Sequence, residues 1–143
     1  MQKLTIGDIM WEHPIKVKDS ISVGSVAHLL LRYRINGILV VRKNNENKLV
    51  GVFTVTDILR MIDKILPRGT KRIEELKRIA KIPVGKVATK RVFSLQKSAK
   101  FLKAVALMHK KHIHTIPIYD KNKLVGVIGR HDILNMALNY TEA

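Results

Sequence analysis

Two aspartates, Asp57 and Asp132, occupy equivalent positions in two copies of one sequence pattern, and their spacing suits nucleotide chemistry. In the first copy the pattern is Gly51-x-x-Thr54-x-x-Asp57, between an apolar run and a stretch with helical spacing. A helix that begins after a strand offers free backbone N–H groups and a positive dipole end to a phosphate. An aspartate one turn into the helix can accept hydrogen bonds from two vicinal ribose hydroxyls.

The same pattern has a structural interpretation of about equal weight. A threonine at the N-cap and an aspartate three positions later can form a capping box, an ordinary way to begin a helix. In the second copy, however, Gly129 removes the capping hydroxyl, while Asp132 remains and follows Arg130 and His131. Capping explains the second copy less well, so the local sequence leaves both interpretations open.

The repeat that contains these aspartates extends over most of the chain. Residues 48–59 return 75 positions later as residues 123–134, with the same apolar run, glycine and aspartate. Earlier segments return 78 positions later, because one connection is three residues shorter in the second copy, as expected of a surface turn. These segments are 6–9 with 84–87, and 35–40 with 113–118. An internal repeat of this kind decides the architecture.

Hydrophobic periodicity predicts the order β-α-β-β-α in each copy. An extended segment at 14–17 leads to a helix capped by Asp19 or Ser20, with apolar residues at helical spacing. The apolar positions of this helix are Val23, Val26, Ala27 and Leu30, matched in the second copy by Phe101, Ala104, Val105 and Met108.

The second part of each copy is a strand pair followed by a helix. Strands at 37–41 and 49–53, joined by a polar turn at 44–47, precede a helix at 57–66 that Pro67-Arg68-Gly69 ends. Between the copies, residues 70–81 predict a basic amphipathic helix with Ile73, Leu76 and Ala80 on its apolar side.

We therefore expect an α/β (α+β) protein. The predicted boundaries are 1–69 for the first repeat, 70–82 for the connector helix and 83–143 for the second repeat. One copy alone would be marginal by surface-to-volume scaling, so we expect both repeats to form one globular module.

Composition narrows the class of protein. The chain has 143 residues, is 46% hydrophobic and contains no cysteine, which excludes disulfides and thiol chemistry. No apolar stretch approaches the roughly 20 residues of a transmembrane helix, and the N-terminus lacks the apolar run of a signal peptide. We expect a soluble, cytoplasmic protein without a membrane partner.

Charge is the other strong signal. The chain carries 27 basic and 11 acidic residues, a formal charge of +16, of which residues 70–143 contribute +11. Such a field attracts nucleotides, nucleic acid and acidic protein surfaces, although a solvated lysine-rich surface would look the same. Nucleic-acid binding by the second half and the connector helix is thus an alternative function, but 5% aromatic content offers few platforms for stacking bases.

The motifs, in this order and twice, resemble a tandem pair of CBS (cystathionine β-synthase) domains. They are Asp-Ile-Met at 8–10, Ile-x-x-Ile-Pro-Ile at 113–118 and Leu-Val-Gly-Val-x-Thr-x-x-Asp-Ile-Leu at 49–59. The resemblance covers essentially the whole chain and implies a pair with pseudo-two-fold symmetry, packed sheets and two clefts. It implies AMP, ADP, ATP or S-adenosylmethionine as a regulatory ligand in those clefts, with no cofactor required. It also implies a homodimer that regulates a partner protein, here in trans.

The resemblance assigns residues to the two clefts. The family's ribose-binding aspartate falls on Asp57 and Asp132, and its phosphate-contacting hydroxyl falls on Thr54 alone. Each cleft takes its adenine wall from the opposite copy. The Asp57 cleft, which we favour, would use Lys86, Arg91, Ile113, His114 and Thr115. The Asp132 cleft would use Ile35, Asn36 and Gly37, with Arg130 or His131 compensating for the hydroxyl missing at Gly129.

Other chemistry has little support in the sequence. No nucleophile elbow, phosphate loop or His-Glu-x-x-His motif is present, so we do not expect an enzyme. On a strand, His112 and His114 would face the same side, but no third ligand has suitable spacing, and we expect no metal site. We expect Trp11 to be buried in the core or in an interface.

Overall fold

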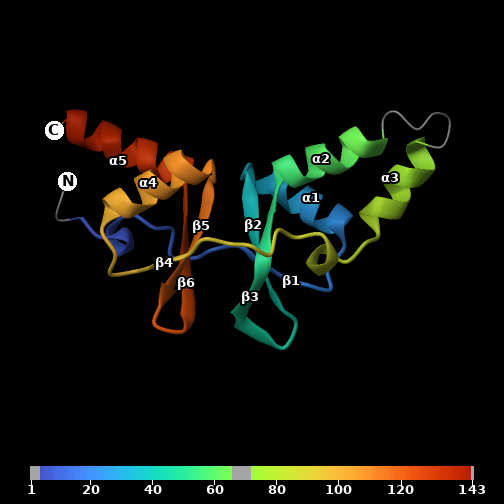
Figure 1. The fold of residues 1–143 in the computed structure, drawn as a ribbon, viewed down its shortest axis with the longest axis horizontal. Helices are drawn as coiled ribbons and strands as arrows, with labels where there is room; N and C mark the ends of the chain where they lie inside the picture. Colours follow the sequence, from blue (N-terminus) through green and yellow to red (C-terminus); the bar gives the residue numbers. More distant parts are fainter. Residues whose placement is uncertain (1–3, 66–71, 143) are drawn as a thin grey trace. The chain divides into compact units, whose positions relative to one another are not determined.

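The computed structural model describes residues 4–65 and 72–142, and it divides into two compact units (Figure 1). The central unit is Ile15–Arg91, and the terminal unit combines Met1–Pro14 with Val92–Ala143. The central unit contains β1 (Lys16–Lys18), α1 (Val23–Tyr33), β2 (Gly37–Arg42), β3 (Asn45–Thr54), α2 (Val55–Ile65), α3 (Arg72–Ala80) and the 3-10 turn η3 (Val84–Lys86). The terminal unit contains the 3-10 turn η1 (Ile6–Asp8), β4 (Leu95–Gln96), α4 (Phe101–Lys111), β5 (Thr115–Asp120), β6 (Lys123–Gly129) and α5 (Arg130–Glu142).

Each unit is built on a three-stranded sheet of the same topology. The strand orders are β1-β2-β3 and β4-β5-β6, with the first pair parallel and the second pair antiparallel in each sheet. Gly37 pairs with Thr54 in one sheet, and Thr115 pairs with Gly129 in the other. The predicted α/β class with two β-α-β-β-α repeats is confirmed.

Each sheet buries one face under its helices. In the central unit, Val26 and Leu30 of α1 pack with Val40 and Phe53, which are at most 3% exposed. In the terminal unit, Phe101 and Ala104 of α4 are buried, and Ala104 packs in one cluster with Ile116, Ile118 and Ile128. The helical spacing read from the sequence therefore identified the buried face of both helices.

The ends of several elements differ from their predicted positions. Ser22, rather than Asp19 or Ser20, caps α1, because its Oγ accepts the N–H of Ser25 at 3.2 Å. Strand β3 already begins at Asn45, since backbone pairing extends beyond the buried part of the hairpin into residues that stay exposed. Helix α2 begins two residues earlier than predicted, and its predicted end at 66–69 lies outside the described residues.

The connector helix α3 packs against the core of the central unit at its C-terminal end, through Ile79, and less along the rest of its predicted apolar side. Ile73 is 68% exposed and Leu76 is 42% exposed, and none of the helix's residues is fully buried. The predicted start at residue 70 lies outside the described part of the chain. Amphipathic spacing gives a helix a potential contact face, but it does not supply a partner for that face.

The boundaries of the two compact units differ from the boundaries of the two sequence repeats. Residues 4–14 join the second repeat: Ile6 is fully buried there, and its N–H donates to the Ala99 carbonyl at 2.8 Å. In the same way Val84 joins the first repeat, and its N–H donates to the Ile21 carbonyl at 2.7 Å. Each repeat thus receives an apolar residue from the 3-10 turn that opens the other repeat.

The net positive charge is divided more unevenly between the two compact units than between the two halves of the sequence. The central unit carries 18 basic and 6 acidic residues, whereas the terminal unit carries 9 and 5. The central unit therefore holds a formal +12 of the total +16. Among the helices of the described residues, none has the length and apolar character needed to cross a membrane.

We predict that Gly51→Ala destabilises the protein by about 1–3 kcal/mol. An added Cβ would lie 3.0 Å from the carbonyl carbon of Thr89 and closer still to its oxygen, and this backbone cannot move aside as a flexible side chain would. The midpoint of urea unfolding measures the loss. Gly129→Ala is the control, because a Cβ there would meet its nearest atom at an ordinary 3.6 Å. Equal losses in both variants would contradict the steric argument.

Candidate functional site

The first strand-to-helix junction is a complete capping box. Strand β3 ends at Thr54, and α2 begins at the next residue. The N–H and the hydroxyl of Thr54 donate to Asp57 Oδ2 at 2.8 and 3.0 Å, and the N–H of Asp57 donates to Thr54 Oγ1 at 3.2 Å. Asp57 is only 8% exposed. The structural interpretation is therefore confirmed in this copy, and the Thr54 hydroxyl both donates and accepts within it.

The second oxygen of Asp57 also has donors. Thr89 Oγ1 donates to Asp57 Oδ1 at 3.3 Å, and Arg60 Nη1 lies 3.4 Å from the same oxygen as an ion pair. Both distances are long for hydrogen bonds of their kinds. Sequence reasoning missed Thr89, although the repeat extends to this position. Thr89 is the equivalent of Trp11 at the offset of 78, and both follow the matching segments 6–9 and 84–87 by two positions.

The second junction leaves its aspartate half satisfied. The N–H of Gly129 donates to Asp132 Oδ2 at 2.7 Å, and no described residue donates a recorded hydrogen bond to Oδ1. Burial raises the pKa of Asp132 above its ordinary value, while the Gly129 N–H and the positive charge of His131 oppose that rise. A partly buried carboxylate with one open oxygen can accept hydroxyl donors without first losing an internal partner.

The segment before β2 lies at the strand-to-helix junction of the central unit, and the segment before β5 lies at the junction of the terminal unit. The N–H of Val55, the first residue of α2, donates to the Asn36 carbonyl at 2.9 Å, and Gly37 pairs with Thr54. In the terminal unit, the His114 carbonyl would be the nearest atom to a Cβ on Gly129. The structure thus brings Asn36 and Gly37 to the junction that contains Asp57, and His114 and Thr115 to the junction that contains Asp132. No contact of Ile35 or Ile113 with these junctions is among those of the described residues.

The predicted exchange of these segments between the copies remains a prediction. It would join Ile113, His114 and Thr115 to the junction of the other unit. Lys86 and Arg91 belong to the same unit as Asp57, and both are exposed.

The Asp132 junction has basic surroundings. Desolvation lowers the pKa of His114, and the positive charges of Arg130 and His112 lower it further. The sign of these interactions shows that the surroundings of His114 are electropositive. With its pKa lowered, His114 is a neutral imidazole at neutral pH and presents an N–H donor.

The histidine pair does not have the geometry that a shared strand would give. His112 caps α4 in a left-handed conformation, with φ of 53°, and residues 112–114 precede β5 rather than belonging to it. The premise that both histidines lie on one strand is therefore wrong. Within residues 4–65 and 72–142, no group of three histidine, aspartate or glutamate side chains could hold a metal ion.

Trp11 is not a core residue. Its backbone pairs with Val127 in the terminal unit, but its side chain is 59% exposed. The repeat explains the exposure, because Trp11 occupies the position of Thr89, which is likewise paired through its backbone and exposed. A large apolar residue suggested burial, whereas the position requires only backbone pairing.

Comparison with known proteins identifies the family. The CBS domain model matches residues 6–64 and 84–139, so the chain belongs to the CBS domain family. Inosine-5'-monophosphate dehydrogenase of Methanocaldococcus jannaschii is 30% identical over 128 residues, which are 89% of this chain and 22% of that protein. The chain thus spans about a fifth of the length of that enzyme. The family model that matches this chain is that of the CBS domain.

Solved structures share this fold at low sequence identity. CBSX2 in complex with AMP aligns with a TM-score of 0.74 at 24% identity, covering 96% of this chain and 98% of that one. The CBS domain pair of protein MJ0100, in complex with 5-methylthioadenosine and S-adenosyl-L-methionine, also aligns at 0.74, with 23% identity and coverages of 96% and 98%.

We predict that Thr54→Val lowers the free energy of unfolding by about 1 kcal/mol, the usual cost of losing an N-cap hydroxyl. The variant loses the hydroxyl that accepts the Asp57 N–H and donates to the Asp57 carboxylate. Urea unfolding measures the change. Thr56→Val is the control at an exposed threonine inside α2, two residues after Thr54, and the capping account would fail if both variants lost the same amount.

A second prediction concerns pH. Because the pKa of Asp132 is raised in the folded state, its contribution to stability is full below the ordinary aspartate pKa of about 4 and is lost as the pH rises through the folded value. Asp132→Asn does not titrate, and its amide oxygen can still accept the Gly129 N–H. The stability of the variant relative to the wild type should therefore rise with pH across this window. A difference that stays constant between about pH 3 and about pH 7 would contradict the raised pKa.

Proposed function

We propose that this chain is a regulatory module that binds an adenine-containing ligand, AMP, ADP, ATP or S-adenosylmethionine, at its strand-to-helix junctions. The observation that carries the proposal is a buried or half-buried aspartate at each junction, one turn into a helix that directly follows a strand. In each case the segment before the middle strand lies alongside and can supply backbone groups to a base. The solved CBS pairs that contain AMP or S-adenosylmethionine support the ligand class.

The hydrogen bonds favour Asp132 over Asp57 as the easier ribose site. At Asp132, ribose hydroxyls can donate to Oδ1, which has no recorded donor among the described residues. At Asp57, a ribose must displace the long contacts from Thr89 and Arg60. A buried carboxylate gains more from new donors when it does not lose old ones. The sequence favoured the Asp57 cleft because of Thr54, but that hydroxyl is already engaged in capping.

Phosphate groups would be held by the basic residues near each junction. At the terminal unit these are Arg130, His131 and His114, of which Arg130 acts electrostatically on His114. At the central unit they are Lys86 and Arg91. A guanidinium can bind two phosphate oxygens at once, and a neutral histidine can donate one N–H.

The wider role follows from the family. We propose that ligand binding shifts the population of conformations and that the output reaches a partner protein in trans, from a cytoplasmic homodimer. We propose no enzymatic reaction, because the match to the dehydrogenase involves only 22% of that enzyme. Nothing in the fold or in the comparisons favours the nucleic-acid alternative that the charge suggested.

Isothermal titration with AMP, ADP, ATP and S-adenosylmethionine tests the proposal, with the wild type beside Asp57→Asn and Asp132→Asn. We expect saturable binding of at least one ligand, weakened about 10- to 100-fold in Asp132→Asn, since hydrogen bonds to a charged group are worth about 1.5–3 kcal/mol. Asp57→Asn should weaken it less. Both variants keep an oxygen for capping, so unfolding curves serve as the control for folding.

Two results would overturn the proposal. One is the absence of saturable binding for all four ligands. The other is binding that neither variant changes and that falls steeply with added salt, which would indicate general attraction of anions to a basic surface.

A further inference from the structure

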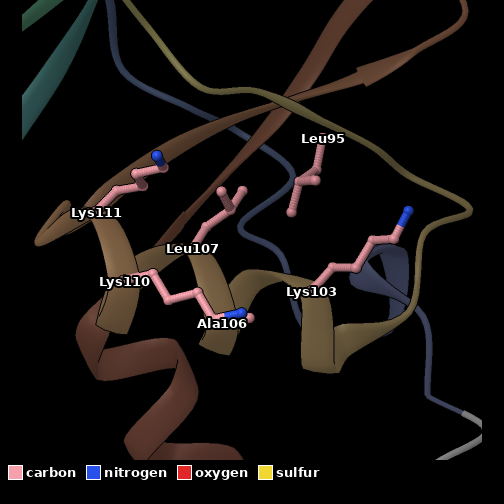
Figure 2. Close-up of a pocket in the computed structure, with 6 residues that line it drawn as sticks. All are labelled: Leu95, Lys103, Ala106, Leu107, Lys110 and Lys111. Atoms are coloured by element: carbon pink, nitrogen blue, oxygen red, sulfur yellow. The ribbon is translucent and has the colours of Figure 1, made fainter.

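A shallow pocket of about 300 Å³ lies on the terminal unit, away from the aspartate junctions. Figure 2 shows Leu95 of β4 and Leu107 of α4 between the side chains of Lys111 and Lys103, with Lys110 beside Ala106. We call it the lysine-rimmed pocket. It is lined by Leu95, Lys103, Ala106, Leu107, Lys110 and Lys111. None of these residues takes part in the proposed nucleotide site.

The first repeat lacks this lysine rim. At the offset of 78, the equivalents of Lys103 and Lys111 are Ser25 and Tyr33, although the equivalent of Leu107 is again a leucine. Both repeats bury their helices against a sheet of the same topology, so folding does not require the two lysines. Lys103 and Lys111 are thus particular to this copy, whereas the equivalent of Lys110 is Arg32, which keeps the positive charge.

The positive charges of the rim have no anionic partners in the described chain. The ion pairs recorded there join Arg60 with Asp57 and Arg78 with Glu75, both in the central unit. Lys111 instead lies over the ring of Phe93, with its Nζ 5.5 Å from the ring centroid, which holds the ammonium group beside the pocket. An apolar floor with an unneutralised cationic rim is complementary to an apolar group flanked by anions.

The spacing of the lysines favours an extended peptide over a single anion. Lys103 and Lys111 are eight residues apart on α4, about 12 Å along the helix axis. Two anionic groups at about that spacing match the lysines more closely than one phosphate does. In an extended peptide, side chains four residues apart point to the same face and lie about 13 Å apart, with the side chain between them on that face too.

We propose that the lysine-rimmed pocket docks an acidic segment of a partner protein, of the form Glu-x-Leu-x-Glu. Aspartate can replace either glutamate, and another large apolar residue can replace the leucine. The central apolar side chain lies on Leu95 and Leu107, and the two carboxylates reach Lys103 and Lys111. Lys110 adds a third positive charge beside them. The residues that line this pocket include neither aspartate and none of the residues proposed to hold the nucleotide.

Fluorescence polarisation of a labelled peptide, Gly-Ser-Glu-Ser-Leu-Ser-Glu-Ser-Gly, tests the docking on the full chain at low salt. We expect saturable binding that weakens about tenfold when both glutamates become glutamine, as two exposed ion pairs are lost. Replacing the leucine by serine should weaken it by a similar factor, because the apolar burial is lost while the charge stays.

Variants of the protein supply the matched controls. Lys103→Gln/Lys111→Gln should weaken binding about tenfold. Lys121→Gln/Lys123→Gln removes the same charge from the turn between β5 and β6 of the same unit and should leave binding unchanged. Ala106→Glu places a carboxylate at an exposed helical position of the pocket and should abolish binding without unfolding the helix.

The proposal is overturned if the peptide shows no saturable binding up to millimolar concentration. It is also overturned if the serine peptide binds as well as the leucine peptide, or if the two double variants lose affinity equally. In the last two cases the chain attracts polyanions through its overall charge and has no built docking site.

Discussion

A short backbone ladder between Val52 and Thr89 is the contact on which the central unit and its junction depend. The N–H of Val52 donates to the Thr89 carbonyl at 3.0 Å, and the N–H of Thr89 returns the bond at 2.9 Å. This pairing attaches the segment after η3 to β3, which places Val84 in the core and the Thr89 hydroxyl against Asp57. Trp11 and Val127 make the equivalent ladder in the terminal unit, at 3.0 and 3.2 Å. Gly51 and Gly126 stand beside these ladders because a side chain would collide with the paired backbone.

The sequence was sufficient for the fold because the repeat, the helical spacing and the strand composition all pointed to one architecture. It was also sufficient for the positions of Asp57 and Asp132, which the repeat aligns. It could not tell Ser22 from Asp19 or Ser20 as the cap of α1, since all three side chains can cap and only the backbone path selects one. It could not foresee Thr89 as a partner of Asp57, because that hydrogen bond joins residues 32 positions apart.

The two junctions show how a duplicated unit can diverge without changing its fold. In one copy the aspartate is committed to structure, with donors on both oxygens. In the other copy a glycine replaces the threonine, and the aspartate keeps a single internal bond while burial raises its pKa. The first arrangement stabilises the start of a helix, and the second leaves a carboxylate with unused capacity. The two copies thus keep the same aspartate at the same position while its hydrogen bonds differ.

The terminal unit is built from two separate segments of the chain, which has a consequence for folding during synthesis. Residues 15–91 are continuous, so the central unit has all of its parts once residue 91 has left the ribosome. The terminal unit needs residues 4–14 together with residues from 92 onward, and Ile6 meets its partner at Ala99 only after the whole central unit has been made. Until then, the apolar side chains of the first segment have no core to enter. The central unit is thus an insertion within the terminal one, and the contacts of Ile6 are non-local, a kind that as a rule forms slowly.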